Sequence, residues 1–417
     1  MIPAVVFAFA LLVRIPFMWT QGYPEDVFQY SQWTWKAFHF GIYSLYDATH
    51  GITSDNYPLC LFPFKVIGLL YNALTGSFER ISMYDPLLRF LLRTPAVICD
   101  LAIGIGLYFW TKRRHSEKIA VTAAALYMFN PGIIFDSALY GQIDSIHAAF
   151  CLFAFLLILD CRPVTAGILI GLAAFQKPQS FALFPIFAAT IAQRQGTKGL
   201  LKAFMGATAA GVVATAPFIL GGSLPNLFKF LLSTAAVHPT ISWYADNFWL
   251  LLYGRDAFTM PDTARAWFLP FSYRVVGIGL VASFYGYIIR RSLKTSDPST
   301  LLRWAAISVL VFFFFATQMH ENYLYLALPL LAFAAPDSRH ARILYAVLSG
   351  LFFINMTLYY PAFLDWVGGG SYWINSARRM DAIAHLLILG WALWSFQDSV
   401  TIGRTPDAKR TKGANPA

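Results

Sequence analysis

Long apolar runs separated by short basic clusters constrain this chain more than any other feature of its sequence. A helix needs roughly 20 mostly apolar residues to cross the hydrocarbon core of a bilayer. Backbone groups in lipid must also be satisfied internally, which favours helices. The sequence therefore predicts an all-α polytopic membrane protein with about twelve transmembrane helices. The expected helices lie near 2–20, 94–111, 119–135, 144–160, 164–176, 180–193, 200–220, 268–289, 302–318, 323–336, 342–361 and 380–397.

The composition supports a lipid environment and argues against nucleic acid as a partner. Hydrophobic residues make up 58% of the 417 residues and charged residues only 12%, against roughly 25% charged in an ordinary soluble domain. The net charge of +10 comes from Lys and Arg clusters between apolar runs, a pattern typical of topology-setting loops. The four cysteines lack the spacing of metal ligands, so we expect neither a zinc site nor a disulfide framework.

The basic clusters also predict an orientation. The residues 112–118, 194–202 and 290–294 and the tail 401–417 fall on one side of the expected topology, which the positive-inside rule makes cytoplasmic. Two long segments, 21–93 after the first helix and 221–267 after the seventh, then lie outside. We expect residues 1–400 to form one transmembrane module with its catalytic surface in these loops, followed by a cytoplasmic basic tail at 401–417. The apolar start is interpreted as a first helix, because it lacks the pattern of a removed signal.

The first long segment opens with two adjacent carboxylates, Glu25 and Asp26, followed by Trp33 on an expected interfacial helix. Carboxylates at a membrane surface are unfavourable unless they are solvated or used. A structured loop without chemistry is the other interpretation. Pro58 and Pro63 argue against an uninterrupted span at 57–71, so we expect that segment to lie along the interface.

Further polar residues are expected at the same outer surface. Asp100, inside the second helix, is expected to face the bundle interior, as a functional residue or as a hydrogen-bond partner of a neighbouring helix. Gln142 and Asp144 follow the third helix, where helix capping is the competing explanation for Asp144. Lys177 lies at the outer end of a helical hairpin, either snorkelling to the interface or contacting a phosphate.

Three other groups are candidates. His320 and Glu321 are adjacent just outside the ninth helix, and an imidazole can donate to a phosphate oxygen. The second long loop contains Asp246, Asn247 and Trp249, which combine an aromatic face with hydrogen-bonding groups that a sugar can use, although interfacial aromatics are also common. Arg378 and Arg379 precede the last helix and can bind lipid headgroups or a lipid phosphate.

The order of these pieces resembles that of the GT-C glycosyltransferases. The chain looks most like bacterial relatives of the GPI mannosyltransferase that adds the second mannose, and more distantly like dolichyl-phosphate-glucose-dependent glucosyltransferases. The resemblance spans about 20 to 330 and rests on Asp26 with Trp33, NPGIIFDSALYGQIDS at 130–145, KPQ at 177–179, DNFW at 246–249 and MHENY at 319–323. One departure is Asn322, where relatives usually carry a basic residue.

The resemblance implies an inverting hexosyltransferase of mannose or a glucose-like sugar. In the family, the acid of the first loop is the general base, a role that falls here to Asp26, and the His of the MHE motif contacts the donor phosphate, a role that falls to His320. On the residues themselves, Lys177, Arg378 and Arg379 are assigned as helpers at that phosphate. The groups expected at the acceptor or sugar are Glu25, Trp33, Gln142, Asp144, Asp246, Asn247, Trp249 and Glu321.

The expected partners are a polyprenyl-phosphate-linked sugar donor, membrane lipid, and a lipid-linked glycan, polysaccharide or protein as acceptor. Neither a cofactor nor a metal is expected. The bacterial likeness favours a plasma membrane with the site facing the periplasm or exterior, and the endoplasmic reticulum is the alternative location.

Two other functional classes fit a twelve-helix protein. A multipass transporter or flippase of lipid-linked sugars commonly shows internal repeats with broken helices. No such repeat is found, and the two long outer segments are placed asymmetrically. A non-catalytic subunit of an envelope assembly is expected to lack the acid of the first loop, and this chain keeps Asp26.

Overall fold

The computed structural model describes residues 2–234, 237, 239–267, 269–368 and 372–395. Helices dominate these residues, and isolated β-bridges take the place of strands among them. The α-helices are α1 Ile2–Met18, α2 Pro24–Phe40, α3 Leu61–Thr75, α4 Pro86–Lys112, α5 Glu117–Met128, α6 Pro131–Ile134, α7 Asp144–Leu159, α8 Pro163–Gln176, α9 Phe184–Leu220, α10 Leu224–Ser233, α11 Phe248–Tyr253, α12 Tyr273–Ser292, α13 Pro298–Phe315, α14 Ala327–Ala334, α15 Arg339–Leu358, α16 Pro361–Trp366 and α17 Tyr372–Ser395.

Each of the twelve expected helical ranges overlaps at least one of these helices. By length and hydropathy, five helical segments of the described chain can cross a membrane, or six if the bent pair Glu117–Met128 and Pro131–Tyr140 is one span. The apolar helices Ile2–Met18, Asp144–Leu159, Pro163–Gln176 and Ala327–Asp337 are shorter than that criterion requires. The all-helical membrane fold therefore stands, whereas the number of twelve spans and the sidedness stay predictions. The expected basic tail at 401–417 lies outside the described residues.

Local backbone signals explain two differences from the expected helices. The two ranges at 180–193 and 200–220 fall on the single element α9, which is broken at Gly196, a residue with a left-handed φ of 63°. The segment Pro58–Thr75 meets the criterion for a span, although two prolines argued against it. Pro58 and Pro63 lie at the start of this helical segment, where a missing N–H interrupts no helical hydrogen bond.

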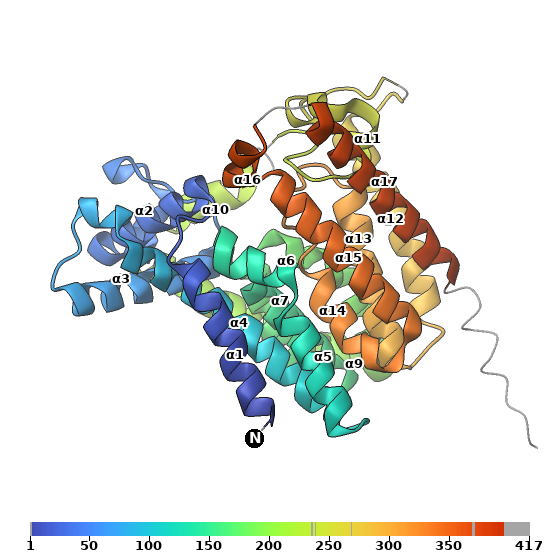
Figure 1. The fold of residues 1–417 in the computed structure, drawn as a ribbon. Helices are drawn as coiled ribbons and strands as arrows, with labels where there is room; N and C mark the ends of the chain where they lie inside the picture. The colour runs from blue at the N-terminus through green and yellow to red at the C-terminus, as the bar shows by residue number, and fades with distance from the viewer. Residues whose placement is uncertain (1, 235–236, 238, 268, 369–371, 396–417) are drawn as a thin grey trace, which may run out of the picture.

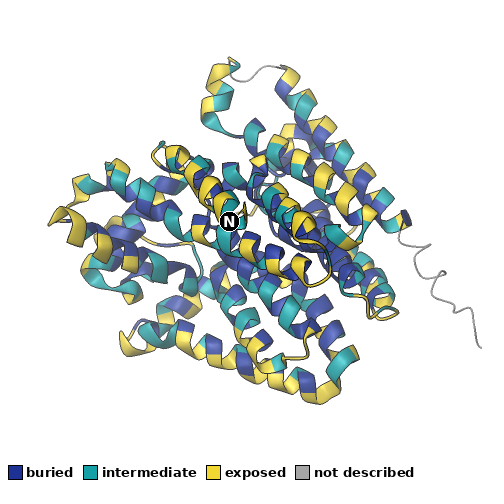
Figure 2. Ribbon diagram, turned by 60° about the horizontal axis from the view of Figure 1, so that its bottom comes forward, coloured by how far each residue is buried: buried dark blue, intermediate teal, exposed yellow. Residues whose placement is uncertain are grey.

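The interior of the bundle is apolar, and so is much of its outer surface. Most of α13 and α14 is buried at the centre of the main core. Figure 2 shows exposed residues along the outward faces of the surrounding helices. Many of these exposed residues are large and hydrophobic, as on α9, where Phe204 is 71% and Met205 69% exposed. Outward apolar faces of this kind suit contact with lipid.

A buried polar cluster joins three parts of the bundle. The Asp100 carboxylate of α4 accepts hydrogen bonds from the hydroxyls of Tyr325 and of Ser137. The Arg14 guanidinium of α1 lies 3.7 Å from the same carboxylate. The prediction that Asp100 faces the bundle interior is thereby confirmed, and these contacts fit its structural interpretation. Such pairing relieves the cost of a carboxylate at membrane depth.

The two long inter-helical segments gather at one end of the bundle. Figure 1 shows α2, α10, α11 and α16 at the end opposite the chain's N-terminus. Helices α2 and α3 pack on each other and form a lobe to one side of α1 and α4. This arrangement brings segments that are distant in sequence together around one cavity.

Candidate functional site

A cavity of about 560 Å³ lies at this end of the bundle. Helices α2 and α10 form part of its walls. The other parts are the loop before α3, the turn before α7, the residues that follow α8, and the loop between α13 and α14. The lining residues are Asp26, Gln29, Tyr30, Trp33, Asp55, Asn56, Tyr57, Gln142, Lys177, Pro178, Gln179, Phe181, Leu231, Thr234, Val237, Phe312, Thr317, Gln318, Met319, His320, Asn322 and Tyr323. Five of the predicted site residues, Asp26, Trp33, Gln142, Lys177 and His320, are thus brought together here.

Asp26 places a carboxylate on the wall of this cavity. It lies in the first turn of α2, is half-buried, and accepts a hydrogen bond from the Gln142 amide. The Tyr30 hydroxyl donates to the other end of that amide at 3.2 Å and fixes its orientation. Burial raises the pKa of Asp26 to about 7, against the lowering effect of Lys177, and the charges of Asp55 and Glu25 add to the rise. A carboxylate with a pKa near neutrality can take up a proton during a reaction.

Two turns with left-handed glycines hold the start of α2 against the α7 turn. Gly22 has φ 73° and Gly141 φ 96°, conformations that only glycine adopts readily. Between them, the Tyr23 N–H donates to the Tyr140 carbonyl at 2.9 Å. The buried Arg93 guanidinium donates to the carbonyls of Met18 at 2.6 Å and Thr20 at 3.0 Å. These contacts fix the distance between Asp26 and Gln142.

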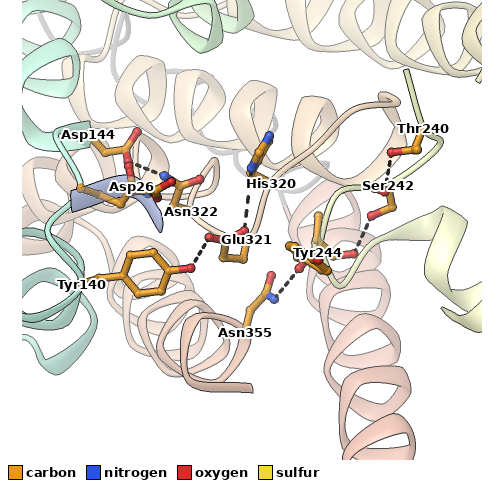
Figure 3. A network of polar contacts seen from close by, with 12 residues as sticks. Asp26, Tyr140, Asp144, Thr240, Ser242, Tyr244, His320, Glu321, Asn322 and Asn355 are labelled. Atoms are coloured by element: carbon orange, nitrogen blue, oxygen red, sulfur yellow. Dashed lines mark hydrogen bonds and ion pairs between the residues drawn. The ribbon is translucent and has the colours of Figure 1, made fainter. Parts of the chain in front are cut away.

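Lys177 is a buried cation at the cavity wall with a carboxylate partner. Its ammonium group donates to Oδ1 of Asp144 at 3.0 Å, and the Asn322 amide donates to Oδ2 of Asp144 at 2.7 Å. Asp144 is fully buried behind these two residues and does not line the cavity. Asn322, the departure from the family pattern, therefore holds the carboxylate that positions Lys177 (Figure 3).

His320 and Glu321 occupy the loop between α13 and α14, with different surroundings. The ring of His320 lines the cavity and stacks on Tyr323 with ring centroids 4.8 Å apart. Glu321 is buried behind it and accepts a hydrogen bond from the Tyr140 hydroxyl at 2.7 Å. Figure 3 shows Glu321 between Tyr140 and His320, whose Nδ1 lies 4.0 Å from the carboxylate. Burial raises the pKa of Glu321 to about 7, opposed by the Tyr140 hydrogen bond.

The loop that carries His320 is fixed from the side by the second long segment. The Trp243 N–H donates to the Met319 carbonyl at 2.8 Å, and Trp243 and Tyr244 form β-bridges with His320. The Asn355 amide of α15 donates to the Tyr244 carbonyl at 3.1 Å (Figure 3). The histidine is thus held by backbone contacts, which leaves its ring at the cavity.

Besides Asp144 and Glu321, four predicted sugar-binding residues lie outside the cavity lining. Glu25 is exposed and lines a separate cavity of about 380 Å³. Asn247 caps α11, since its side chain accepts the N–H of Trp249 at 3.1 Å. The indole of Trp249 is fully buried and donates to the Phe315 carbonyl at 3.0 Å. Asp246 is also buried and accepts the Tyr359 hydroxyl at 2.8 Å. These contacts give the Asp-Asn-Phe-Trp sequence a structural role.

The two arginines before the last helix also lie away from the cavity. Arg378 is buried, with its guanidinium carbon 3.9 Å from the centre of the Tyr359 ring and one N–H donated to the Leu358 carbonyl at 2.7 Å. Its charge opposes the effect of burial and of Asp381, which together raise the pKa of Asp246. Arg379 is exposed beside Gly254. Neither arginine is among the residues that line the cavity.

The cavity contains polar residues that sequence reasoning missed. Asp55 adds a second acidic side chain to the lining, and Gln179 and Gln318 add amides. The only available signal for Asp55 was its position two residues before the segment 57–71. Within the described part of the chain, no group of three or more His, Cys, Asp or Glu side chains has an arrangement that could hold a metal ion.

Comparison with known proteins adds one finding. The family model of glycosyltransferase family 87 matches residues 88–316, which is more than half of the chain. A search of curated proteins finds no match. The matched range includes Gln142, Asp144 and Lys177 but ends before His320 and begins after Asp26.

Proposed function

Because this chain belongs to glycosyltransferase family 87, we propose that it transfers a hexose from a polyprenyl-phosphate carrier to an acceptor hydroxyl, with inversion at the anomeric carbon. The hexose is mannose or a glucose-like sugar, and the acceptor is a lipid-linked glycan, a polysaccharide or a protein. The cavity faces the periplasm or exterior. Its end of the bundle lies away from the connection between α4 and α5, which carries the basic cluster at 112–118, and this supports that side as the outer one.

In the proposed reaction Asp26 acts as the general base. Its carboxylate takes the proton of the acceptor hydroxyl as the acceptor oxygen forms a bond to the anomeric carbon. The bond from that carbon to the phosphate oxygen breaks, and its electron pair leaves with the polyprenyl phosphate. A single displacement of this kind inverts the anomeric configuration. The raised pKa of Asp26 favours proton uptake near neutral pH.

The charge that grows on the leaving phosphate needs stabilisation from fixed cations or donors. Lys177 and His320 are the residues of the lining best suited to this role, and both are held in place by the contacts described above. The ammonium of Lys177 retains further N–H donors beyond the one given to Asp144. Arg378 and Arg379 are not needed for this role, because they lie outside the lining.

The other part of the cavity suits a lipid. Phe181, Leu231 and Phe312 contribute an apolar wall, and Phe181 is 45% exposed. An isoprenoid chain can lie against such a wall while its phosphate contacts the polar end, so the two-part lining supports a lipid-linked donor over a water-soluble nucleotide sugar.

The observation that carries the proposal is the convergence of one carboxylate and two cationic or donor groups, from three distant parts of the chain, on one cavity: Asp26, Lys177 and His320. A base and a phosphate-binding pair are the two elements that the displacement requires.

The donor class is tested by incubating the purified protein in nanodiscs with labelled polyprenyl-phosphate hexoses, and separately with nucleotide hexoses, together with an acceptor extract. We expect label transfer from a polyprenyl phosphate alone and a product whose anomeric configuration, read by NMR, is opposite to that of the donor. Transfer from the nucleotide sugar, or a product of retained configuration, contradicts the proposal.

A further inference from the structure

A second, larger cavity lies between α5 and α15, away from the one described above. Its volume is about 940 Å³, and its lining is mostly apolar. Figure 1 shows α5 and α15 on either side of α14. Ala332 of α14 lines the cavity, as do Ala335 and Pro336, which follow α14 in the chain. The side walls include Leu126 and Phe129 of the α5 segment. We call this cavity the α5–α15 groove.

The groove is closed at one end. The Asn130 amide donates to the Tyr345 hydroxyl at 2.9 Å and to the Ser349 hydroxyl at 2.7 Å. The Tyr345 hydroxyl donates to the Leu126 carbonyl at 3.2 Å. These bonds tie the carboxyl end of α5 to the middle of α15. Before the amino ends of the two helices, Arg114 and His115 contact the Asp337 carboxylate at 3.4 and 2.7 Å, and these three residues do not line the groove.

The end of the groove near the amino ends of α5 and α15 carries two cations. Lys118, in the first turn of α5, and Arg342, in the first turn of α15, both line the groove and are exposed. Arg342 is oriented by hydrogen bonds to the carbonyls of Ala335 at 3.0 Å and Pro336 at 3.4 Å. Neither cation has an acidic partner among the described residues.

We propose that the α5–α15 groove binds an anionic phospholipid, with an acyl chain along the apolar walls and the headgroup phosphate between Lys118 and Arg342. An apolar slot closed at one end and flanked by two cations at the other matches the chemistry of such a lipid. The chain's own residues 401–417 are a poor occupant, because they carry four basic residues and one acid. This inference is independent of the proposed reaction.

Native mass spectrometry of the delipidated full-length protein tests the proposal, with phosphatidylglycerol and phosphatidylcholine as probes. We expect phosphatidylglycerol to bind at least about tenfold more tightly. The double variant Lys118→Ala/Arg342→Ala should lose this preference. The matched control Lys198→Ala/Lys202→Ala removes two exposed cations elsewhere and should keep it.

A third variant, Ala346→Trp, fills the groove without removing a cation. It should weaken phosphatidylglycerol binding while the monodisperse profile in size-exclusion chromatography is kept. The proposal is overturned if Lys118→Ala/Arg342→Ala binds phosphatidylglycerol as wild type does, or if both lipids bind equally. It is also overturned if the groove proves to be filled by a second copy, seen as a dimer that Ala346→Trp abolishes.

Discussion

At the residue scale, Asp26 shows that burial can outweigh a nearby positive charge. Lys177 lowers the pKa of this carboxyl and the Gln142 amide hydrogen-bonds to it, yet the net effect is a rise to about 7. The reason lies in the competition for Lys177, whose ammonium group is paired directly with Asp144. Asp26 therefore keeps the proton affinity that a base requires, and Lys177 stays at the cavity wall through its bond to Asp144.

The pKa of Asp26 predicts a pH dependence. Because the base must be deprotonated, kcat/KM should be lost as the pH falls through about 7 and reach a plateau above it. Glu321, whose pKa is also raised to about 7, is the matched control. In steady-state assays, the Glu321→Gln variant should still lose kcat/KM as the pH falls through about 7. If kcat/KM of that variant no longer falls at acidic pH, Glu321 and not Asp26 is the titrating group.

The Lys177 and Asp144 pair predicts a separation of stability from binding. Lys177→Gln leaves a buried carboxylate unpaired and should destabilise the protein by about 3–5 kcal/mol, seen as a lower Tm. The double variant Lys177→Gln/Asp144→Asn removes both charges and should recover most of the Tm. Its KM for the donor should stay about tenfold or more above wild type. If KM recovers together with Tm, Lys177 does not contact the phosphate.

The limits of sequence reasoning are also visible residue by residue. Asp26, Gln142, Lys177 and His320 were predicted together because the expected topology places them on one side of the membrane and the family resemblance covers the pieces that carry them. Asn247 and Trp249 were assigned to a sugar because an amide and an indole can bind a ligand. The same amide can instead cap a helix, and the hydrogen bonds in the structure show that it does. Asp55 was missed, since a single acid in a loop carries no pattern.

At the scale of elements, the turn before α7 sets the geometry of the site. Gly141 has φ 96°, and a Cβ there would lie 2.9 Å from Cγ2 of Val27 in α2. Gly141→Ala should therefore lower both Tm and kcat, because α2 must shift away from Gln142. Gly76→Ala is the control: its φ is 79°, but a Cβ there meets nothing within 4 Å.

The two variants share the backbone cost of about 1–2 kcal/mol for a left-handed residue with a side chain. We expect both to lose some Tm in thermal scanning, and Gly141→Ala alone to lose activity. Equal activity of the two variants would contradict the role given to this turn.

The helices themselves were largely predictable, because a long apolar run in lipid has few other options. The sequence did not reveal where each apolar run is broken into separate helices. The pair Glu117–Met128 and Pro131–Tyr140 bends by 47° at a break where Asn130, the residue before Pro131, is extended. Pro58 and Pro63, in contrast, lie at the start of a helical segment that continues beyond them. The effect of a proline depends on its position within the helix, and that position is fixed only once the boundaries are known.

At the scale of the whole molecule, two cavities of the bundle differ in their chemistry. The first combines carboxylate, amide and cationic groups with an apolar wall, and the second is an apolar groove with two cations at one end. The first contains the residues proposed for glycosyl transfer, and the second is proposed to hold a lipid. A single helical fold thereby separates a reaction site from a membrane contact.

The most direct test of the central claim is the transfer rate of Asp26→Asn beside that of Glu25→Gln. The two variants remove one charge each from neighbouring residues, but only Asp26 lines the cavity. We expect Asp26→Asn to lose activity by about 100-fold or more, as removal of a general base does, with folding and donor binding retained. Glu25→Gln should stay within about twofold of wild type. Transfer by Asp26→Asn at the wild-type rate would contradict the account.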